Sequence, residues 1–347
     1  MMQRLRINRK FIPLLATIVL FILAYAFGYL QYKGMRDPQA FFNLFINNSH
    51  LLLAGIGETF VILSGGIDLS PGAIIALTST ASAYLLEKEG LVPEIVIPLM
   101  LLMGTALGAI MGSIIHYFKV QPFIATLMGM FFARGMAFFI SLDAIAISDP
   151  FYRDLSLSRI PIPFLENTHI STSVVAALVV LAIAMYLLHL TRFGRTVYAI
   201  GGNEQSALLM GLPVAQTKVL VYTLAGFCSA LAGVAYSIAL LSGHGLYTVG
   251  LELDSIAAVV IGGTLLTGGV GYVFGTMFGV LVSGLIQMLI MFNGQLSSWW
   301  TRIAIGALTL VFISVQSAFA ASKKRQIAVR AAKKDQASQA AAPAQGR

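Results

Sequence analysis

The chain has 347 residues, of which 58% are hydrophobic and 10% are charged, and its formal net charge is +8. Soluble domains carry roughly 25% charged residues, so this composition and the mean hydropathy of +0.85 exclude an ordinary soluble fold and predict a membrane protein. The single cysteine, Cys228, excludes an internal disulfide framework and a cysteine-based metal site, and the five histidines lie far apart without metal-ligand spacing.

Apolar stretches of about 20 residues, long enough to cross a bilayer, predict an all-α polytopic membrane protein. In chain order we expect about ten transmembrane helices, at residues 11–30, 43–64, 71–86, 95–117, 123–141, 170–190, 217–241, 251–264, 272–292 and 299–320. An even number of spans places both termini on the same side. Residues 1–10 would form the N-terminal segment and 11–320 the transmembrane domain, followed by a basic tail at 321–347 that we expect to be disordered.

The distribution of charge indicates that both termini are cytoplasmic. One side of the predicted spans receives 15 basic residues against two acids, Glu204 and Asp335, whereas the other side receives six basic residues and ten acids. Because Lys and Arg accumulate on the cytoplasmic side, the basic net charge needs no nucleic-acid partner. The basic start, the first apolar stretch and Ala24-Tyr25-Ala26 also resemble a cleavable signal peptide. We favour an uncleaved first helix because nine further spans follow it.

The apolar run from Phe60 to Leu77 is interrupted by residues 65–72 (GGIDLSPG), which carry an acid at membrane depth. Glycine costs about 1 kcal/mol and proline about 3 kcal/mol inside a helix, so a continuous helix is unfavourable here. Irregular backbone with an ionisable group is tolerated at this depth only inside protein or beside a wet cavity. We therefore interpret the segment as a broken helix of a solute pathway, with Asp68 buried, satisfied by backbone amides near the Gly65-Gly66 break, and setting the ends of two half-helices.

A second glycine pair occurs in a similar sequence. Residues 65–72 and 262–269 share the pattern G-G-x-x-L-[ST]-x-G, and each follows a short apolar segment rich in β-branched residues. Glycine-interrupted segments at corresponding places in two halves point to a transporter's binding region. Coincidence in a glycine-rich chain is the alternative interpretation. The predicted pathway residues are Glu58, Gly65, Gly66, Asp68, Ser70, Gly262, Gly263 and Thr267.

Two of the predicted connections are long. Residues 142–169, with three prolines and mixed charges, predict an external loop that is long enough to meet another protein. In the cytoplasmic loop 191–218, Asn203 can cap a short helix, Glu204–Met210, that stops at Gly211. Spacing alone leaves two interpretations of this helix open, a docking element for a cytosolic partner and a solvated interfacial turn.

Other motifs mainly indicate packing. Glycines recur at every fourth position in 104–112 and 271–279, which places small residues on one helix face and allows close approach of helices. The second stripe could also leave room for a solute. Arg134 needs a carboxylate, backbone carbonyls or water as partner, and Glu58 and Asp68 are candidates. The sequence has no phosphate loop, nucleophile elbow or zinc-protease motif, so we expect neither an enzyme nor a bound cofactor.

Three segments, in order within residues 10–320, resemble the inner-membrane permeases of bacterial sugar ABC importers, the class of the ribose, xylose, arabinose and galactoside systems. They are Phe60–Ser70 (FVILSGGIDLS), Val197–Gly211 (VYAIGGNEQSALLMG) and Val259–Gly279 (VVIGGTLLTGGVGYVFGTMFG). Within the class, residues 252–271 and 296–306 are most similar to a permease of the galactofuranose importer. The family usually continues with Val-Gly-Ser after Ser70, whereas this chain has Pro-Gly-Ala at 71–73, which puts any role of that serine hydroxyl in doubt.

The resemblance implies the partners of the chain. Such permeases work as pairs in the bacterial inner membrane, with the solute path between them. A periplasmic sugar-binding protein delivers the sugar, and a cytosolic ATPase with two nucleotide-binding halves drives alternating access. The galactofuranose system implies a heterodimer of two related permeases, and a homodimer is the alternative. The residues that match the family's ATPase-coupling segment are Gly201, Gly202, Asn203, Glu204, Ala207 and Gly211, with Ala207 expected on the contact face.

Two hypotheses from other functional classes remain open. In a secondary transporter driven by an ion gradient, Glu58 or Asp68 would carry the proton or the sodium ion. The other alternative is a purely structural membrane subunit, but this hypothesis explains neither the glycine breaks nor the capped helix of the inner loop.

Overall fold

The computed structural model describes residues 12–163, 165, 167–297 and 299–315, so the predicted N-terminal segment 1–10 and tail 321–347 lie outside it. Its described helices are α1 (Ile12–Gln31), η2 (Lys33–Arg36), α2 (Pro38–Leu63), α3 (Pro71–Glu87), α4 (Pro93–Tyr117), α5 (Pro122–Ile140), α6 (Pro150–Leu157), α7 (Thr172–Leu190), α8 (Arg192–Gly202), α9 (Glu204–Leu209), α10 (Val214–Leu240), α11 (Leu251–Ile261), α12 (Val273–Asn293) and a last helix, Trp299–Val315. Two short antiparallel pairs join β1 (Ile145–Ala146) to β4 (Ser242–Gly243) and β2 (Ile160–Pro161) to β3 (His169–Ile170). The fold is therefore helical, as predicted.

Each of the ten predicted segments is helical where the structure describes it, and the differences lie at the ends. α2 begins at Pro38, because Asp37 accepts a hydrogen bond from the Gln39 amide (2.9 Å) and proline suits the first helical position. α11 ends at Ile261, before the glycine pair 262–263. The short helices η2, α6 and α8 were not predicted, because they lie in connections without a long apolar period.

Six described helices are long and apolar enough to cross a membrane: α1, α4, α5, α7, α10 and α12. α2 and α3 are instead surrounded by protein, since every residue from 51 to 63 and from 71 to 83 is buried. A helix that its neighbours cover at membrane depth can carry polar side chains. The length and apolar character of the helices thus support a multi-pass membrane protein.

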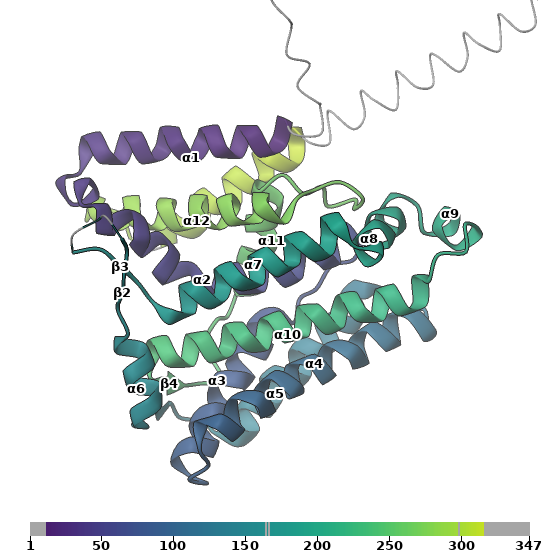
Figure 1. Ribbon diagram of the computed structural model, residues 1–347, viewed down its shortest axis with the longest axis horizontal. Helices are drawn as coiled ribbons and strands as arrows, with labels where there is room; N and C mark the ends of the chain where they lie inside the picture. Colours follow the sequence, from purple (N-terminus) through teal and green to yellow (C-terminus); the bar gives the residue numbers. More distant parts are fainter. Residues whose placement is uncertain (1–11, 164, 166, 298, 316–347) are drawn as a thin grey trace, which may run out of the picture.

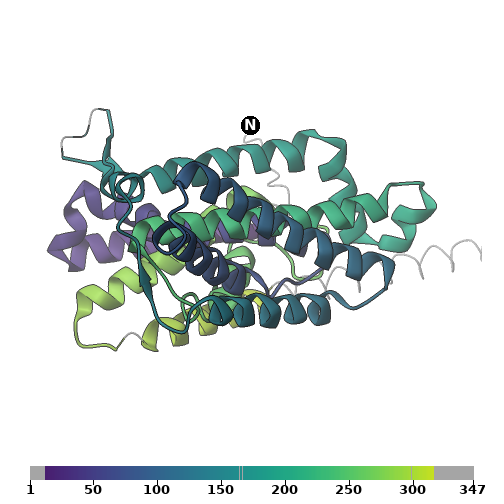
Figure 2. The ribbon, with the colours of Figure 1, turned by 90° about the horizontal axis from the view of Figure 1, so that it is seen from below.

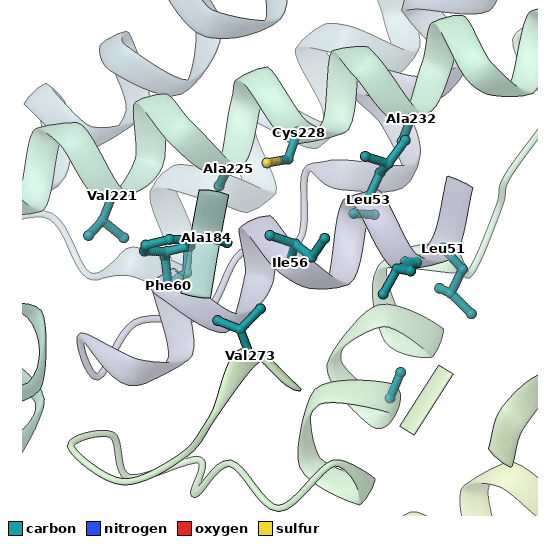
Figure 3. Packing of buried hydrophobic residues seen from close by; sticks show 14 of the residues in the cluster. Leu51, Leu53, Ile56, Phe60, Ala184, Val221, Ala225, Cys228, Ala232 and Val273 are labelled. Carbon is teal, nitrogen blue, oxygen red and sulfur yellow. The ribbon is translucent and has the colours of Figure 1, made fainter. Parts of the chain in front are cut away.

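α2 is the centre of the main hydrophobic cluster. Its residues Leu53, Ile56 and Phe60 belong to one cluster with Ala225 and Ala232 of α10, as Figure 3 shows. The backbones of α2 and α10 approach closely at Gly57. A β-carbon on Gly57 would lie only 2.9 Å from the Ala225 Cα atom of α10. This packing encloses the end of α2, where the first glycine break begins.

The two ends of the helical body differ in structure. Figures 1 and 2 both show α9 at one end and the β2–β3 hairpin at the opposite end. At the hairpin end, β1 and β4 connect the loop after α5 to the loop after α10. The Gln39 side chain of α2 accepts from the His169 amide (2.8 Å) and donates to its carbonyl (3.1 Å). Strand pairs and side chains therefore fasten the loops at this end.

Both glycine stripes are packing seams, as predicted. The stripe 104–112 of α4 lies against α10, where β-carbons on Gly104 and Gly108 would overlap the Gly226 and Tyr222 backbone. The stripe 271–279 lies against α11 and the residues that follow it, so the second stripe leaves no room for a solute between these two segments. Small residues at such seams let helix backbones meet directly.

Candidate functional site

The predicted break in the first glycine segment is present. α2 ends at Leu63, residues 64–70 are irregular, and α3 begins at Pro71. Gly65 adopts a positive φ of 81°, a conformation that favours glycine, and the Gly65 and Gly66 amides donate back to the carbonyls of Ile62 (2.9 Å) and Val61 (3.0 Å). These glycines therefore terminate α2.

Asp68 is fully buried in the break, and a backbone amide of the break satisfies it, as predicted. Asp68 Oδ1 accepts from the Ser70 amide (2.8 Å) and also from the Ser70 hydroxyl (2.7 Å), which was not predicted, while the Gly65 and Gly66 amides end α2. The Asp68 amide in turn donates to Glu58 Oε1 (3.3 Å). Asp68 thus fixes the start of α3 against α2, which is a structural role.

Tyr222 of α10 completes this buried polar group. A β-carbon on Gly66 would overlap the Tyr222 hydroxyl, so the phenol lies against the glycine backbone of the break. The Tyr222 hydroxyl, Glu58 Oε2 and Asp68 Oδ2 are buried without a hydrogen-bond partner among the described residues. No sequence signal indicated Tyr222, because a single tyrosine on an apolar helix resembles any interfacial aromatic residue.

Arg134 was expected to need a carboxylate, backbone carbonyls or water, and backbone carbonyls fill that role. Its Nη1 atom donates to the carbonyls of Gly245 (2.8 Å) and Tyr247 (2.7 Å) in the loop between α10 and α11. In the described chain neither Glu58 nor Asp68 forms an ion pair with it. Arg134 therefore stabilises the loop between α10 and α11, at the end of the molecule that holds the β2–β3 hairpin, and has no part in the break between α2 and α3.

The second glycine segment has a different conformation from the first. In the first segment the leading glycine, Gly65, has the positive φ, whereas in the second Gly262 has a φ of −62° and Gly263 has a φ of 95°. A β-carbon on Gly263 would lie 3.0 Å from the Leu14 amide at the start of α1. The shared sequence pattern therefore ends a helix twice, but with two geometries, and Thr267 is exposed in the loop that follows.

Three glycine segments that are far apart in the sequence meet at one point, which we call the glycine junction: Gly65, Gly201 and 268–269. The Gly269 amide donates to the Leu63 carbonyl at the end of α2 (2.9 Å). A β-carbon on Gly201 would overlap that same carbonyl oxygen, and one on Gly268 would lie 2.8 Å from the Gly65 amide. The end of α8, the break after α2 and the loop after α11 thus touch through backbone atoms alone.

Tyr198 of α8 adds a side-chain contact beside the junction. Its hydroxyl donates to the Gly271 carbonyl (2.8 Å). Burial, and secondarily the neighbouring Tyr272, raises the pKa of Tyr198, so the phenol keeps the proton that it donates. This bond connects α8 to the loop after α11.

The short capped helix predicted in the inner loop is present as α9. Asn203 Oδ1 accepts from the Ser206 amide (2.7 Å), and Gly211, with a φ of 73°, follows its end. Glu204 Oε2 accepts from Lys218 Nζ (2.7 Å), an ion pair that ties α9 to α10 and that spacing did not predict. α9 is therefore held to the membrane helices at its first residue.

Ala207 is buried, which corrects the prediction that its side chain is presented to a partner. Its side chain has 0% exposure and packs on Ile200 of α8 and Val214 of α10. The exposed apolar residues of this region are Leu208 (52%), Leu209 (90%) and Met210 (66%). A partner that docks on α9 would meet this apolar tip.

A cavity of about 650 Å³ lies among α2, α11, α12 and the last helix. It combines an aromatic ring, Trp299, with six polar side chains: Asn48, Asp254, Ser283, Gln287, Thr301 and Arg302. Arg302 lies over the Trp299 ring, with its guanidinium carbon 5.6 Å from the ring centroid. Local sequence signals do not indicate this cavity, because the polar residues of the other helices meet Trp299 only in the fold.

Comparison with known proteins gives consistent matches. The family model described as "Branched-chain amino acid transport system / permease component" matches residues 40–313. The inner membrane ABC transporter permease protein YjfF of Escherichia coli K12 is 46% identical over 89% of this chain and 92% of its own length. The fructose import permease protein FruG of Bifidobacterium longum is 40% identical over 90% of this chain and 93% of its own length.

The ribose import permease protein RbsC of Bacillus subtilis is also similar, with 37% identity over 85% of this chain and 89% of its own length. No solved structure gives a significant match. Each of these three relatives is named as a permease.

Proposed function

The chain belongs to this family of transport permease components, and from that premise we propose that it forms one half of the sugar path of an ATP-driven importer. It is an ABC permease of the inner membrane and not an enzyme, since the ATPase of such a system is a separate chain. The proposal concerns how this subunit is driven, what it carries and which partners it needs.

α9 carries the proposal. Leu208, Leu209 and Met210 form an apolar tip at the end of the molecule that also holds the glycine junction (Figure 1). Exposed apolar side chains that cluster on a short, capped element are typical of a protein contact. We propose that this tip inserts into a groove of the cytosolic ATPase, and that Gly201, Gly202, Asn203, Glu204, Ala207 and Gly211 shape the loop that presents it.

The proposed substrate is an uncharged monosaccharide. The relatives are named for fructose and ribose, so their names alone do not select one sugar. Galactofuranose is our first choice, on the similarity of residues 252–271 and 296–306. The cavity beside Trp299 offers hydrogen-bonding groups and an aromatic face, which suit sugar hydroxyls and sugar C–H groups.

The proposed assembly has two permeases, an ATPase with two nucleotide-binding halves and a periplasmic sugar-binding protein. We propose a heterodimer with a related permease, about ten spans and cytoplasmic termini, with 142–169 outside and 191–218 inside. The separation of α9 from the β2–β3 hairpin supports opposite sides for these two loops (Figure 2). Residues 65–72 and 262–269 would border the path, and the tail 321–347 would lie in the cytoplasm.

The energy source separates this proposal from its rival. In an ion-coupled transporter, Glu58 or Asp68 would have to exchange an ion with water, yet both carboxyl groups are fully buried. We expect transport in proteoliposomes that contain both permeases, the ATPase and the binding protein to require enclosed ATP. Transport driven by a clamped proton or sodium gradient without ATP would favour the rival.

The docking surface has its own test. Leu209→Arg places a charge on the most exposed residue of the tip, and we expect it to release the ATPase from the purified permease pair. Leu157→Arg is the matched control, because Leu157 is 65% exposed on α6 at the opposite end. Ala207→Arg is unsuitable, since it would disrupt the packing under α9. Retention of a stoichiometric ATPase by Leu209→Arg, with normal transport, would place the docking surface elsewhere.

A further inference from the structure

We propose that Gly201 and Gly268 are positioning residues that pass the movement of α9 directly to the broken helix. This inference rests on the proposed function, because it needs an ATPase that moves α9. It goes further by assigning a mechanical role to the glycine junction, in which Gly65 was predicted as a pathway residue and Gly201 as a coupling residue.

The connection begins at α9 and reaches Gly201 over a very short distance. Asn203 closes α8, since its amide donates to the Ala199 carbonyl (3.0 Å), and its side chain also caps α9. Gly202 and Asn203 are the residues between Gly201 and the first residue of α9. A displacement of α9 therefore moves the last turn of α8 with it.

At Gly201 the movement meets the end of α2 without an intervening side chain. A β-carbon at this position would overlap the Leu63 carbonyl oxygen and the Gly269 amide nitrogen. Close-packed atoms transmit displacement because they cannot be compressed, whereas a side chain between two backbones can absorb it by changing rotamer. The Leu63 carbonyl also accepts from the Gly269 amide, so the loop between α11 and α12 moves together with the end of α2.

Gly268 closes the contact from the other side. With a φ of 81°, it brings its Cα atom so near to the break that a β-carbon would lie 2.8 Å from the Gly65 amide and 3.1 Å from the Gly201 Cα atom. The loop that contains Gly268 connects α11 to α12, and the break that contains Gly65 connects α2 to α3. One contact point thus holds the ends of two interrupted helices and the docking loop.

The experiment compares the sugar transported per ATP hydrolysed in the complete reconstituted complex. We expect Gly201→Ala and Gly268→Ala to lower this ratio by about tenfold, within the range of coupling energies between sites, while the ATPase remains bound and active. Gly135→Ala, at an open position of α5, serves as the control for expression and should keep the wild-type ratio.

A loss of stability alone would lower transport and ATP hydrolysis together and leave their ratio unchanged, which would overturn the proposal. An equal effect of Gly135→Ala would also overturn it, since the contact at the junction would then not matter. If the wild-type complex itself did not use ATP for transport, the proposed function would fail instead. The two failures are therefore distinguishable.

A measurement on the otherwise unaltered chain covers the case in which both variants fail to fold. Arg195 of α8 and Thr267 in the loop between α11 and α12 are exposed, so a cysteine introduced at each position can carry a spin label. The native Cys228 is buried and does not compete for the label. We expect the distance between these two labels to stay constant when the ATPase binds ATP, because the junction moves as one body. A change in that distance on ATP binding would show that the segments separate.

Discussion

Asp68→Ala should destabilise the protein by removing both hydrogen bonds that hold the start of α3. Asp68 Oδ1 accepts from the Ser70 amide at 2.8 Å and from the Ser70 hydroxyl at 2.7 Å, and both residues are fully buried. A buried donor left without a partner costs about 1–3 kcal/mol, so the loss of two acceptor contacts amounts to about 2–6 kcal/mol. This is a large share of the roughly 5–15 kcal/mol by which folded proteins are stable.

Two further variants separate the contributions. Ser70→Ala removes the hydroxyl but keeps the amide contact, so we expect a smaller loss of about 0.5–1.5 kcal/mol. Asp68→Asn keeps a side-chain oxygen that can accept from the Ser70 amide and hydroxyl. We expect it to remain near wild type in stability and in ATP-driven transport.

The assay is thermal unfolding of the purified permease in detergent, combined with ATP-driven uptake. The expected order of midpoints is wild type, Asp68→Asn, Ser70→Ala and then Asp68→Ala. An Asp68→Ala midpoint equal to that of Ser70→Ala would refute the two-bond explanation. A stable Asp68→Asn protein without transport would show instead that the acid itself is needed in the transport cycle.

Three other predictions concern separate parts of the molecule. Asn203→Ala should weaken α9 by about 1 kcal/mol and reduce, without abolishing, the ATPase that co-purifies. Gly108→Leu should open the seam between α4 and α10 and shift the permease to aggregates in size-exclusion chromatography, whereas Gly135→Leu, at an open position, should elute normally. Arg134→Ala should leave two carbonyls without their donor and make the loop 241–250 sensitive to chymotrypsin; resistance equal to wild type would contradict the assigned role.

The sequence predicted the helices well because each is marked by a long apolar run or by specific punctuation. Gly65, Gly66 and Pro71 indicated the first break, and Asn203 with Gly211 indicated α9, since both signals depend on local backbone conformation. Such signals act over a few residues and need no knowledge of the remaining chain. The same reasoning failed for α6 and η2, which are short and lie in polar connections.

Contacts between distant segments were out of reach of local signals. Ala207 was placed on the wrong face because a helix of six residues has no period long enough to show which side is covered. Its orientation follows from the ion pair between Glu204 and Lys218, which connects two helices. In the same way, nothing local to Tyr222 indicates that its hydroxyl lies against the backbone of a break in another helix.

The contrast between the two ends of the molecule has a consequence for how this protein can diverge. At the β2–β3 end, strand pairs and the side chains of Gln39 and Arg134 fasten the loops through backbone atoms, so the side chains of the fastened residues can vary. At the opposite end, the glycine junction joins bare backbones, and no residue is smaller than glycine. Gene duplication can therefore produce permeases with a changed β2–β3 end, while the backbone contact at the glycine junction admits no neutral replacement.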